Sequence, residues 1–310
     1  MPEIVITEFM DEGAVARLAG RHQTLYDPDL ADKPDALKAA LGDARALVVR
    51  NRTQVRGDLL EAGRGLECIG RLGVGLDNID TAACRARGIS VYPATGANDL
   101  SVAEYVMTSA MVLLRRAWFA SDAVAGGHWP RQALIGRELA GHTMGLVGFG
   151  GIAREVAWRA RAFGMEVVAH DPLLLASDPA WQLARNVSLD GVLELADVVS
   201  MHVPLTETTR RMIGAPQLSA MRTGAVLINA ARGGVVDEAA LAEALREKRL
   251  GGAALDVFEQ EPLTAEAGEK FRGLANLILT PHIAGVTEES NVRVSELIAD
   301  KVIGHLDRGR

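Results

Sequence analysis

The sequence contains little cysteine and no long hydrophobic run. Only two cysteines, Cys68 and Cys84, occur among its 310 residues, and their spacing fits neither a disulfide framework nor a metal-ligand motif. Each lies in or beside an apolar stretch, where a buried thiol is the common outcome. No apolar stretch approaches the roughly 20 residues that span a bilayer, and the N-terminus has no signal-peptide pattern. We therefore expect a cytoplasmic protein with no metal site and no membrane contact.

Clustered positive charge is also absent from the sequence. The chain has 33 Lys and Arg against 40 Asp and Glu, a formal net charge of −7, and no basic run is longer than the pair Arg115-Arg116. A nucleic-acid groove needs clustered Lys and Arg to displace counterions from phosphates, so nucleic acid is not an expected partner. A small anion needs only one or two well-placed arginines and is compatible with this composition.

Glycine, in contrast, is abundant, with 32 residues or about a tenth of the chain where roughly 7% is usual. Short β-branched runs alternate with alanine-rich stretches, a pattern typical of α/β folds in which helices cover parallel sheets. The predicted strands are too many for one ordinary doubly wound sheet, and the length also favours two domains. Strands are expected at residues 3–7, 46–49, 68–71, 90–92, 144–147, 166–169, 198–202, 225–229, 252–255 and 277–279.

The boundary between the two expected domains lies near residue 98. A long helix is expected over 101–116, with Ser101 as its N-cap and Glu104 three residues further on. Residues 119–142 are poorly periodic and are interpreted as an arm, of a kind that often packs on a second subunit. The strand-helix alternation restarts at Gly141, and the last helical stretch, 288–306, is assigned to the first domain.

A glycine-rich loop, Gly148-Phe-Gly150-Gly151-Ile-Ala153, joins a predicted strand to a predicted helix. The pattern G-x-G-x-x-A is a permitted form of the dinucleotide-binding fingerprint. Gly148 is expected to form the tight turn, and Gly150 to let the backbone approach a pyrophosphate at the helix N-terminus. A P-loop is excluded because no Gly-Lys-Ser/Thr follows the glycines.

An acidic residue, Asp171, follows the next predicted strand, 23 residues after Gly148. A carboxylate at this place in the fold accepts hydrogen bonds from the adenosine ribose and repels a 2′-phosphate, so NAD is predicted rather than NADP. The alternative interpretation is that Asp171 only opens an Asp-Pro turn. The combination with the glycine loop favours the cofactor interpretation.

Three later strands are followed by Arg232, Glu261 and His282, all predicted to emerge at the carboxyl ends of the sheet that carries the glycine loop. Redox chemistry at a 2-oxo or 2-hydroxy acid needs such a set. Arg232 can hold the carboxylate and the carbonyl oxygen, His282 can exchange a proton with the alcohol oxygen, and Glu261 can orient the imidazole and favour its charge. Each residue taken singly has a structural alternative, but the ordered set behind a dinucleotide loop favours catalysis.

These motifs together resemble the D-isomer-specific 2-hydroxyacid dehydrogenases, in the style of the D-3-phosphoglycerate dehydrogenase branch without its regulatory domain. The resemblance rests on residues 148–153, 170–172, 229–237, 254–262 and 280–285, and extends to 71–80 and 98–104. It implies two Rossmann- or flavodoxin-like α/β domains with parallel sheets. The resemblance also implies a substrate domain of residues 1–98 plus 286–310, with an NAD-binding domain of residues 99–285 inserted into it. It further implies a homodimer that forms through the cofactor domain.

Residue by residue, the resemblance implies that Arg232, Glu261 and His282 are catalytic. The positions that correspond to cofactor contacts are Gly148, Gly150, Gly151, Ile152, Asp171, Val203, Ala230, Asp256 and Gly285. The positions that correspond to substrate contacts are Gly73, Val74 and Gly75, whose backbone binds the carboxylate, together with Asn98, Arg232 and Arg50.

Arg50 matches the position at which phosphoglycerate dehydrogenases bind the distal phosphate, and Arg52 adds a second cation on the same side if the backbone is extended. We therefore predict a small 2-hydroxy acid with phosphate, sulfonate or carboxylate at C3, such as 3-phosphoglycerate or 3-sulfolactate. If the two arginines are only solvated charges, a glyoxylate or hydroxypyruvate reductase is the alternative. A phosphite- or formate-type oxidoreductase and a non-catalytic NAD-sensing protein are further alternatives, and the intact catalytic set argues against the sensor.

Overall fold

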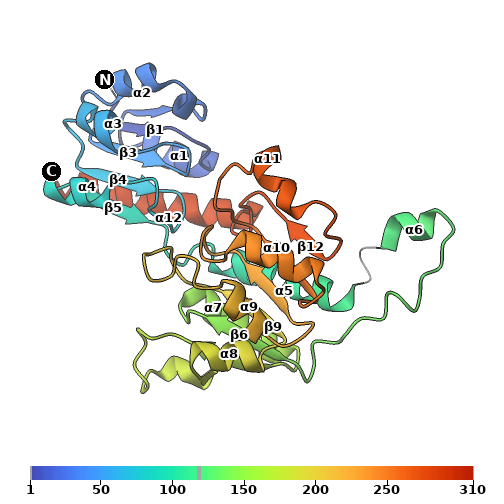
Figure 1. The fold of residues 1–310 in the computed structure, drawn as a ribbon. Coiled ribbons are helices and arrows are strands. Elements are labelled where there is room, and N and C mark those ends of the chain that lie inside the picture. Colours follow the sequence, from blue (N-terminus) through green and yellow to red (C-terminus); the bar gives the residue numbers. More distant parts are fainter. Residues whose placement is uncertain (1, 117–119, 310) are drawn as a thin grey trace. The chain divides into compact units, whose positions relative to one another are not determined.

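The computed structural model describes residues 2–116 and 120–309, so residue 119 of the expected arm lies outside the described residues. The chain divides into two compact α/β units (Figure 1). The first unit consists of Met1–Asn98 and Val286–Arg310, and the second of Asp99–Gly285.

The first unit is built on a five-stranded parallel sheet in the order β2-β1-β3-β4-β5. This is the flavodoxin-like order, in which the direction of winding reverses between β1 and β3. The strands are β1 (Ile4–Ile6), β2 (Thr24–Tyr26), β3 (Ala46–Val49), β4 (Cys68–Arg71) and β5 (Ser90–Pro93). The helices are α1 (Glu12–Ala19), α2 (Pro34–Ala40), α3 (Gly57–Ala62), α4 (Thr81–Ala86) and α12 (Glu288–Leu306), with short 3-10 turns at Leu30–Asp32 and Asp307–Gly309.

Alternate residues of each central strand in this unit point to opposite faces, and both faces are buried. In β3, Ala46 and Val48 pack with Ile298 of α12, whereas Leu47 and Val49 face the opposite cluster. Burial on both sides explains why these strands are nearly continuous apolar runs. It also explains why α12 belongs to this unit, although almost the whole second unit separates it in sequence from β5.

The second unit contains a seven-stranded parallel sheet in the order β12-β11-β10-β9-β6-β7-β8. This is the Rossmann order with one added strand, and its winding reverses between β6 and β9. The strands are β6 (Thr143–Val147), β7 (Glu166–His170), β8 (Arg185–Asn186), β9 (Val198–Met201), β10 (Val226–Asn229), β11 (Gly252–Leu255) and β12 (Leu277–Leu279). The helices are α5 (Asp99–Arg115), α6 (Ser121–Ala125), α7 (Gly151–Ala162), α8 (Leu189–Leu195), α9 (Ala215–Ala220), α10 (Glu238–Arg246) and α11 (Ala265–Gly268), with 3-10 turns at Pro179–Gln182 and Glu269–Phe271.

The faces of the second sheet are covered by different helices. One cluster joins Met144 and Leu146 of β6 to α5 and α7, and the other joins Val199 and Met201 of β9 to α8, α9 and α10. Burying a side chain of this size contributes roughly 1.5–3 kcal/mol. The two clusters fix the carboxyl ends of β6 and β9 side by side.

The predicted fold class, two parallel-sheet α/β domains, is confirmed. Every predicted strand is present, and β2 and β8 are additional strands that the sequence pattern did not indicate. The predicted N-cap at Ser101 is wrong, because α5 begins at Asp99 and Ser101 lies buried inside its first turn. Asn98, Asp99 and Ser101 all carry side-chain acceptors, and local sequence does not rank them as helix starts.

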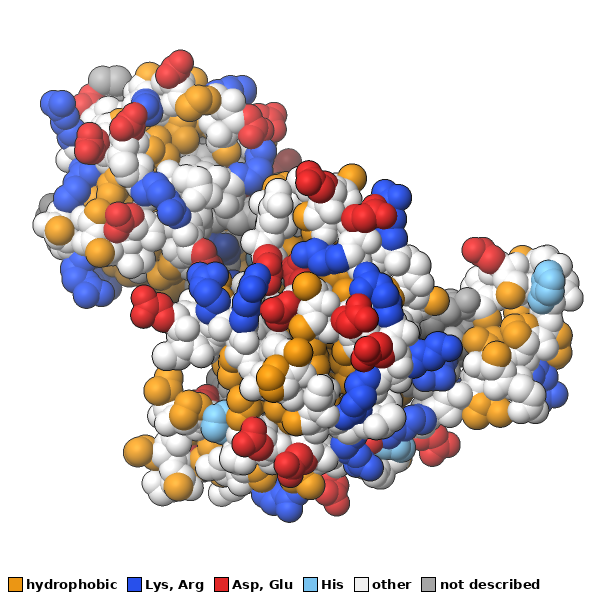
Figure 2. All heavy atoms as spheres, viewed as in Figure 1, with side chains coloured by type: hydrophobic (Ala, Val, Ile, Leu, Met, Phe, Trp, Pro, Cys, Tyr) orange, Lys and Arg blue, Asp and Glu red, His pale blue; other side chains and the backbone are white. Residues whose placement is uncertain are grey.

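The described part of the arm projects from the second unit and carries only the short helix α6 (Figure 1). Apolar side chains are exposed along it (Figure 2), and Val124, Trp129 and Ile135 are among the exposed large hydrophobic residues, whereas Leu139 at its end is buried. In the same view, acidic and basic side chains are interspersed over the surface. Among residues 2–116 and 120–309, no helix is both long and apolar enough to cross a membrane.

Candidate active site

The crevice at the carboxyl ends of β6 and β9 is where an open α/β sheet of this order binds a ligand. β6 runs directly into Gly148, whose N–H donates to the carbonyl of His170 at 2.8 Å. The N–H of His202 donates to the carbonyl of Val147 at 2.7 Å. The ends of three neighbouring strands are thus tied together around the glycine loop.

The glycine loop has the geometry that a dinucleotide pyrophosphate needs. Gly148 has φ +89°, and a methyl group there would lie 2.5 Å from the carbonyl oxygen of His202. A methyl group on Gly150 would meet nothing within 4 Å, so the space above this residue is open. Gly150 also caps α7 without any side-chain acceptor. The first N–H groups of α7, including those of Gly151 and Ile152, are therefore free to bind an anion.

The carboxylate of Asp171 lies beside this loop at the end of β7. One oxygen accepts the N–H of Phe149 at 2.9 Å, and the other accepts the N–H of Leu173 at 2.9 Å. Phe149 is fully buried and stacks on Trp181 with ring centroids 5.1 Å apart. Asp171 is held where the fold places a ribose-binding acid, so the loop and the acid together fit a dinucleotide.

A second carboxylate, that of Asp99, lies against the start of α7. A methyl group on Gly151 would overlap an oxygen of Asp99, which explains why glycine stands at this position. Burial, with the nearby charge of Glu155, raises the pKa of Asp99 above its ordinary value. No sequence motif points to Asp99, because only the fold brings the start of α5 beside the start of α7.

His282 and Glu261 form a direct pair. The Nδ1 atom of His282 lies 2.7 Å from one oxygen of Glu261, and the other oxygen accepts the N–H of Phe258 at 3.0 Å. Burial acts to raise the pKa of Glu261, but the hydrogen bonds from His282 and Phe258 and the charge of Arg232 hold it below its ordinary value. Glu261 is therefore an anion that faces the imidazole.

Asp256 holds the loop on which His282 lies. Its buried carboxylate accepts the Thr280 hydroxyl at 2.6 Å, and it accepts the N–H groups of Ile283 and Ala284 at 2.8 Å each. His282 has φ +56°, a left-handed conformation that side chains other than glycine rarely adopt. Asp256, expected to line the nicotinamide end of a cofactor, thus has both carboxylate oxygens engaged in holding this strained loop.

The Arg232 loop packs on the turn that leads to Glu261. Asn229 brackets this loop, because its side chain donates to the Arg232 carbonyl at 3.0 Å and accepts the Ala231 N–H at 3.1 Å. A methyl group on Gly233 would overlap the carbonyl oxygen of Phe258. The structure therefore brings Arg232, Glu261 and His282 to the same end of one sheet.

The other expected cofactor positions also lie at this end of the sheet. Val203 follows β9, Ala230 follows β10 and Gly285 follows β12, while Ile152 is in the first turn of α7. His202, which no motif marked, lies between β9 and Val203. Burial lowers the pKa of His202 to about 4, so its imidazole is neutral near pH 7, and its Nε2 atom has no hydrogen-bond partner within the described part of the chain.

The first unit holds the remaining expected substrate residues. Gly73, Val74 and Gly75 follow β4, and the N–H groups of Val74 and Gly75 donate to no atom in the described part of the chain. Gly73 has φ +153°. The side-chain oxygen of Asn98 is buried and lacks a hydrogen-bond partner among the described residues. These are the features of a site for a small polar ligand.

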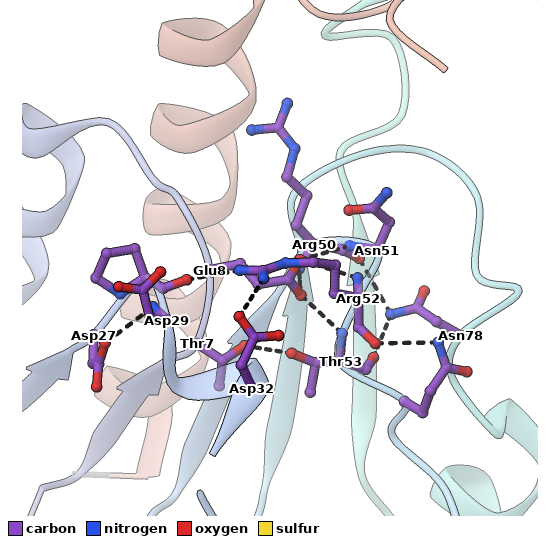
Figure 3. Close-up of polar contacts among 12 residues, drawn as sticks. Thr7, Glu8, Asp27, Asp29, Asp32, Arg50, Asn51, Arg52, Thr53 and Asn78 are labelled. Atoms are coloured by element: carbon purple, nitrogen blue, oxygen red, sulfur yellow. Dashed lines mark hydrogen bonds and ion pairs between the residues drawn. The ribbon is translucent and has the colours of Figure 1, made fainter. Parts of the chain in front are cut away.

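Arg50 and Arg52 lie on the turn after β3, and their side chains point in different directions (Figure 3). The Arg50 guanidinium donates a hydrogen bond to the side-chain oxygen of Asn291 at 2.9 Å and lies 6.0 Å from the centre of the Phe9 ring. The Arg52 guanidinium is tied to Asp32 at 2.7 Å and to the carbonyl of Pro28 at 2.9 Å.

Within the described residues, no three His, Cys, Asp or Glu side chains are grouped so that they could hold a metal ion. Cys68 and Cys84 are both buried as free thiols, and burial raises the pKa of Cys68 to about 12.

Comparison with known proteins gives the same family by three routes. The model of the D-isomer specific 2-hydroxyacid dehydrogenase NAD binding domain matches residues 107–284. The chain is 53% identical over 303 residues to the (S)-sulfolactate dehydrogenase of Chromohalobacter salexigens, and 38% identical over 301 residues to the hydroxypyruvate reductase of Thermotoga maritima, with 97% of each chain covered in both cases.

A D-lactate dehydrogenase of Aquifex aeolicus, solved with NAD and lactic acid, superimposes with a TM-score of 0.86 at 30% identity, covering 99% of this chain and 96% of that one. The glycine loop and Asp171 fit the NAD that this family binds. The chain belongs to the D-isomer specific 2-hydroxyacid dehydrogenase family and is an NAD-dependent 2-hydroxyacid dehydrogenase.

Proposed function

We propose that this dehydrogenase interconverts a 2-hydroxy acid and its 2-oxo acid whose C3 carries a sulfonate, with 3-sulfolactate and 3-sulfopyruvate as the pair. The observation that carries this proposal is the Arg50 guanidinium, which has a single hydrogen bond in the described residues and no carboxylate partner. Because Arg52 is neutralised by Asp32, one free cation remains on the turn. It balances the single charge of a sulfonate better than the nearly double charge of a phosphate at neutral pH.

In the proposed mechanism, the glycine loop and Asp171 would hold NAD, which when bound would supply the acceptor or donor of the hydride at C2. Arg232 orients the substrate by pairing its planar guanidinium with the carboxylate and the C2 oxygen. The backbone N–H groups of Val74 and Gly75 are the second support for the carboxylate. His282 takes the proton from the C2 hydroxyl in oxidation and gives it back in reduction. Glu261 stabilises the imidazolium that forms, from 2.7 Å away.

Two observations support these residue roles, and a third supports the substrate. The anionic state of Glu261 suits the stabilisation of a charged imidazole. The left-handed backbone of His282 is held by Asp256, so the imidazole is fixed before substrate arrives. The relative from C. salexigens, which is 53% identical, is named for sulfolactate.

The substrate assignment is tested by NADH oxidation with 3-sulfopyruvate, 3-phosphohydroxypyruvate, hydroxypyruvate and glyoxylate. We expect kcat/KM to be highest for 3-sulfopyruvate, by about tenfold or more. Equal or better turnover of hydroxypyruvate would instead assign the chain the activity for which its T. maritima relative is named. Arg50→Ala should raise KM chiefly for the sulfonate and phosphate substrates.

The catalytic assignment is tested separately with His282→Ala. We expect kcat to fall by roughly 10²–10⁴-fold, the usual contribution of a general acid, while the Kd for NADH stays within about twofold. Unchanged turnover in the His282 variant would contradict the mechanism.

We also propose that a second copy of this chain covers the arm. Trp129 and Ile135 are 74% and 66% exposed, which is costly for large apolar side chains that lie close together in sequence. Sedimentation should report a dimer for the wild type, and Trp129→Asp combined with Ile135→Asp should shift it to monomer. A monomeric wild type would contradict this assembly.

A further inference from the structure

The carboxylate of Glu8 lies buried beneath the turn that carries Arg50 and Arg52 (Figure 3). Glu8 follows β1 and Arg50 follows β3, and the winding of the first sheet reverses between these two strands. The crevice at such a reversal is where open sheets bind ligands. In this unit, a carboxylate of the chain itself occupies the place that an anionic ligand takes in other sheets.

Each oxygen of Glu8 accepts two backbone N–H groups from the turn 50–53. The four donors are Arg50 at 2.9 Å and Thr53 at 3.0 Å on one oxygen, and Asn51 at 3.2 Å and Arg52 at 3.0 Å on the other. Burial alone would raise the pKa of Glu8, but these donors hold it below its ordinary value. The carboxylate is therefore charged and fully hydrogen-bonded.

Two carbonyl groups of the same turn accept hydrogen bonds from a second buried side chain. Nδ2 of Asn78 donates to the carbonyl of Arg50 at 3.2 Å and to the carbonyl of Thr53 at 2.7 Å. The hydroxyl of Thr53 is paired with that of Thr7 at 2.8 Å. The backbone of the turn thus has neither a free donor for an anion nor freedom to change shape.

The consequence for anion recognition differs between the two arginines. Arg50 extends toward α12, where Asn291 holds one side of its guanidinium, and its other donors have no hydrogen-bond partner among residues 2–116 and 120–309. Arg52 turns back over Glu8, with its Nε atom 3.7 Å from a Glu8 oxygen and its terminal nitrogens on Asp32 and Pro28. One arginine is thus free to bind, and the other links the turn to the 28–32 segment.

We propose that Glu8 is a positioning residue for substrate selection: its carboxylate folds the turn 50–53 so that Arg50 alone contacts the distal anion, while Arg52 braces the turn through Asp32. This inference rests on the proposed function, because it takes the distal anion as the ligand of Arg50. It assigns specificity to a buried acid that touches neither substrate nor cofactor.

Glu8→Gln is the variant that tests the buried acid. The amide has nearly the same shape, but its NH₂ group would face two of the four N–H donors of the turn, so the turn must open. We expect KM for 3-sulfopyruvate to rise about tenfold, KM for glyoxylate to rise less than about twofold, and kcat to stay within about threefold for both. Glu12→Gln, an exposed acid in α1, is the matched control.

Asp32→Asn distinguishes a bracing Arg52 from a substrate-binding Arg52, and it tests the proposal even if Glu8→Gln does not fold. Asp32 is exposed, so its replacement disturbs no core. If Arg52 braces the turn, releasing it loosens the turn and raises KM for 3-sulfopyruvate about threefold. If Arg52 is a ligand, releasing it from Asp32 frees a cation and lowers that KM, which would overturn the proposal.

Arg50→Ala, measured in the same assay, separates this inference from the proposed function. A selective rise of KM in both Arg50→Ala and Glu8→Gln supports both. A selective rise in Arg50→Ala with an unselective or absent effect in Glu8→Gln leaves the proposed function intact and overturns the role of Glu8. An Arg50→Ala variant that affects glyoxylate as much as 3-sulfopyruvate overturns the distal-anion site, and the role of Glu8 with it.

Discussion

The imidazole of His282 and the carboxylate of Glu261 lie 2.7 Å apart, although they belong to different loops that follow β12 and β11. Three contacts define this distance. Phe258 fixes the far oxygen of Glu261, Asp256 holds the Thr280 hydroxyl before His282 and the Ile283 N–H after it, and the neighbouring Arg232 loop packs against Phe258. The distance between His282 and Glu261 is therefore set by contacts among several loops at this end of the sheet and not by either loop alone.

Glu261→Gln should change the pH dependence of the reaction as well as its rate. The negative charge of Glu261 favours the protonated imidazole, which the reduction of a 2-oxo acid requires. Without this charge, the protonated imidazole is less stabilised, so kcat/KM for reduction should fall, and by more at high pH than at low pH. A pH profile of NADH oxidation measures this difference.

Glu259→Gln is the control for Glu261→Gln, because Glu259 lies two residues away and pairs with Arg211 rather than with the imidazole. Its profile should match that of the wild type. If Glu261→Gln lowered the rate equally at every pH, the carboxylate would act only by orienting the ring.

The architecture was predictable from sequence wherever packing is local and periodic. The apolar runs of β3 and β10 mark strands buried on both faces, and Gly148 marks the turn after β6. β8 was not predictable, because its residues Arg185 and Asn186 are exposed at the sheet edge and carry no hydrophobic pattern. Whether such a short segment forms an edge strand depends on the neighbouring strand, and two residues are too few to show a sequence pattern typical of a strand.

The candidate site was predictable to the level of motifs but not of contacts. Arg232, Glu261 and His282 stand in motifs, so their convergence was expected, and their catalytic roles stay predictions. The engagement of Asp256 with the His282 loop, and that of Glu8 with the turn 50–53, join residues from different strands. Nothing in the sequence near Glu8 indicates that β3 lies beside β1. The hydrogen bonds between the Glu8 carboxylate and the turn 50–53 could therefore not be predicted.

Gly150→Ala and Gly148→Ala should separate cofactor binding from folding. A methyl group at Gly150 meets open space, so the melting temperature should stay within about 2 °C of the wild type, while the Kd for NADH should rise at least tenfold because the pyrophosphate needs that space. Gly148→Ala should cost about 1–3 kcal/mol of stability, because its φ is +89° and the carbonyl of His202 is in contact. Thermal melts and NADH fluorescence titrations measure both effects.

If Gly150→Ala lowered the melting temperature as well as the affinity for NADH, the added methyl group would be disturbing the loop itself, even without cofactor. In that case the open space above Gly150 would not be the place of the pyrophosphate.

Asp99→Asn should tighten NADH binding. The carboxylate lies against Gly151 at the start of α7, where the positive end of the helix dipole would attract the pyrophosphate, so its charge opposes the ligand. Removing one such charge should lower the Kd for NADH by about 3- to 10-fold. Asp35→Asn, an exposed first-turn acid of α2, is the control and should leave this Kd unchanged. Weaker NADH binding in Asp99→Asn would mean that the carboxylate supports the loop rather than opposing the ligand.

His202→Asn should flatten the acid side of the stability profile. Burial holds the pKa of His202 at about 4 in the folded state, below its ordinary value of 6.5. Between these two values the unfolded chain binds a proton that the folded chain does not, so acidification through this window favours unfolding. The group opposes folding by up to about 3 kcal/mol at the acid end of the window and has no such effect above pH 6.5. Urea unfolding at pH 7, 6 and 5 should show the wild type losing more stability than His202→Asn. Parallel profiles for wild type and His202→Asn would mean that the buried imidazole takes up its proton in the folded state as readily as in the unfolded chain.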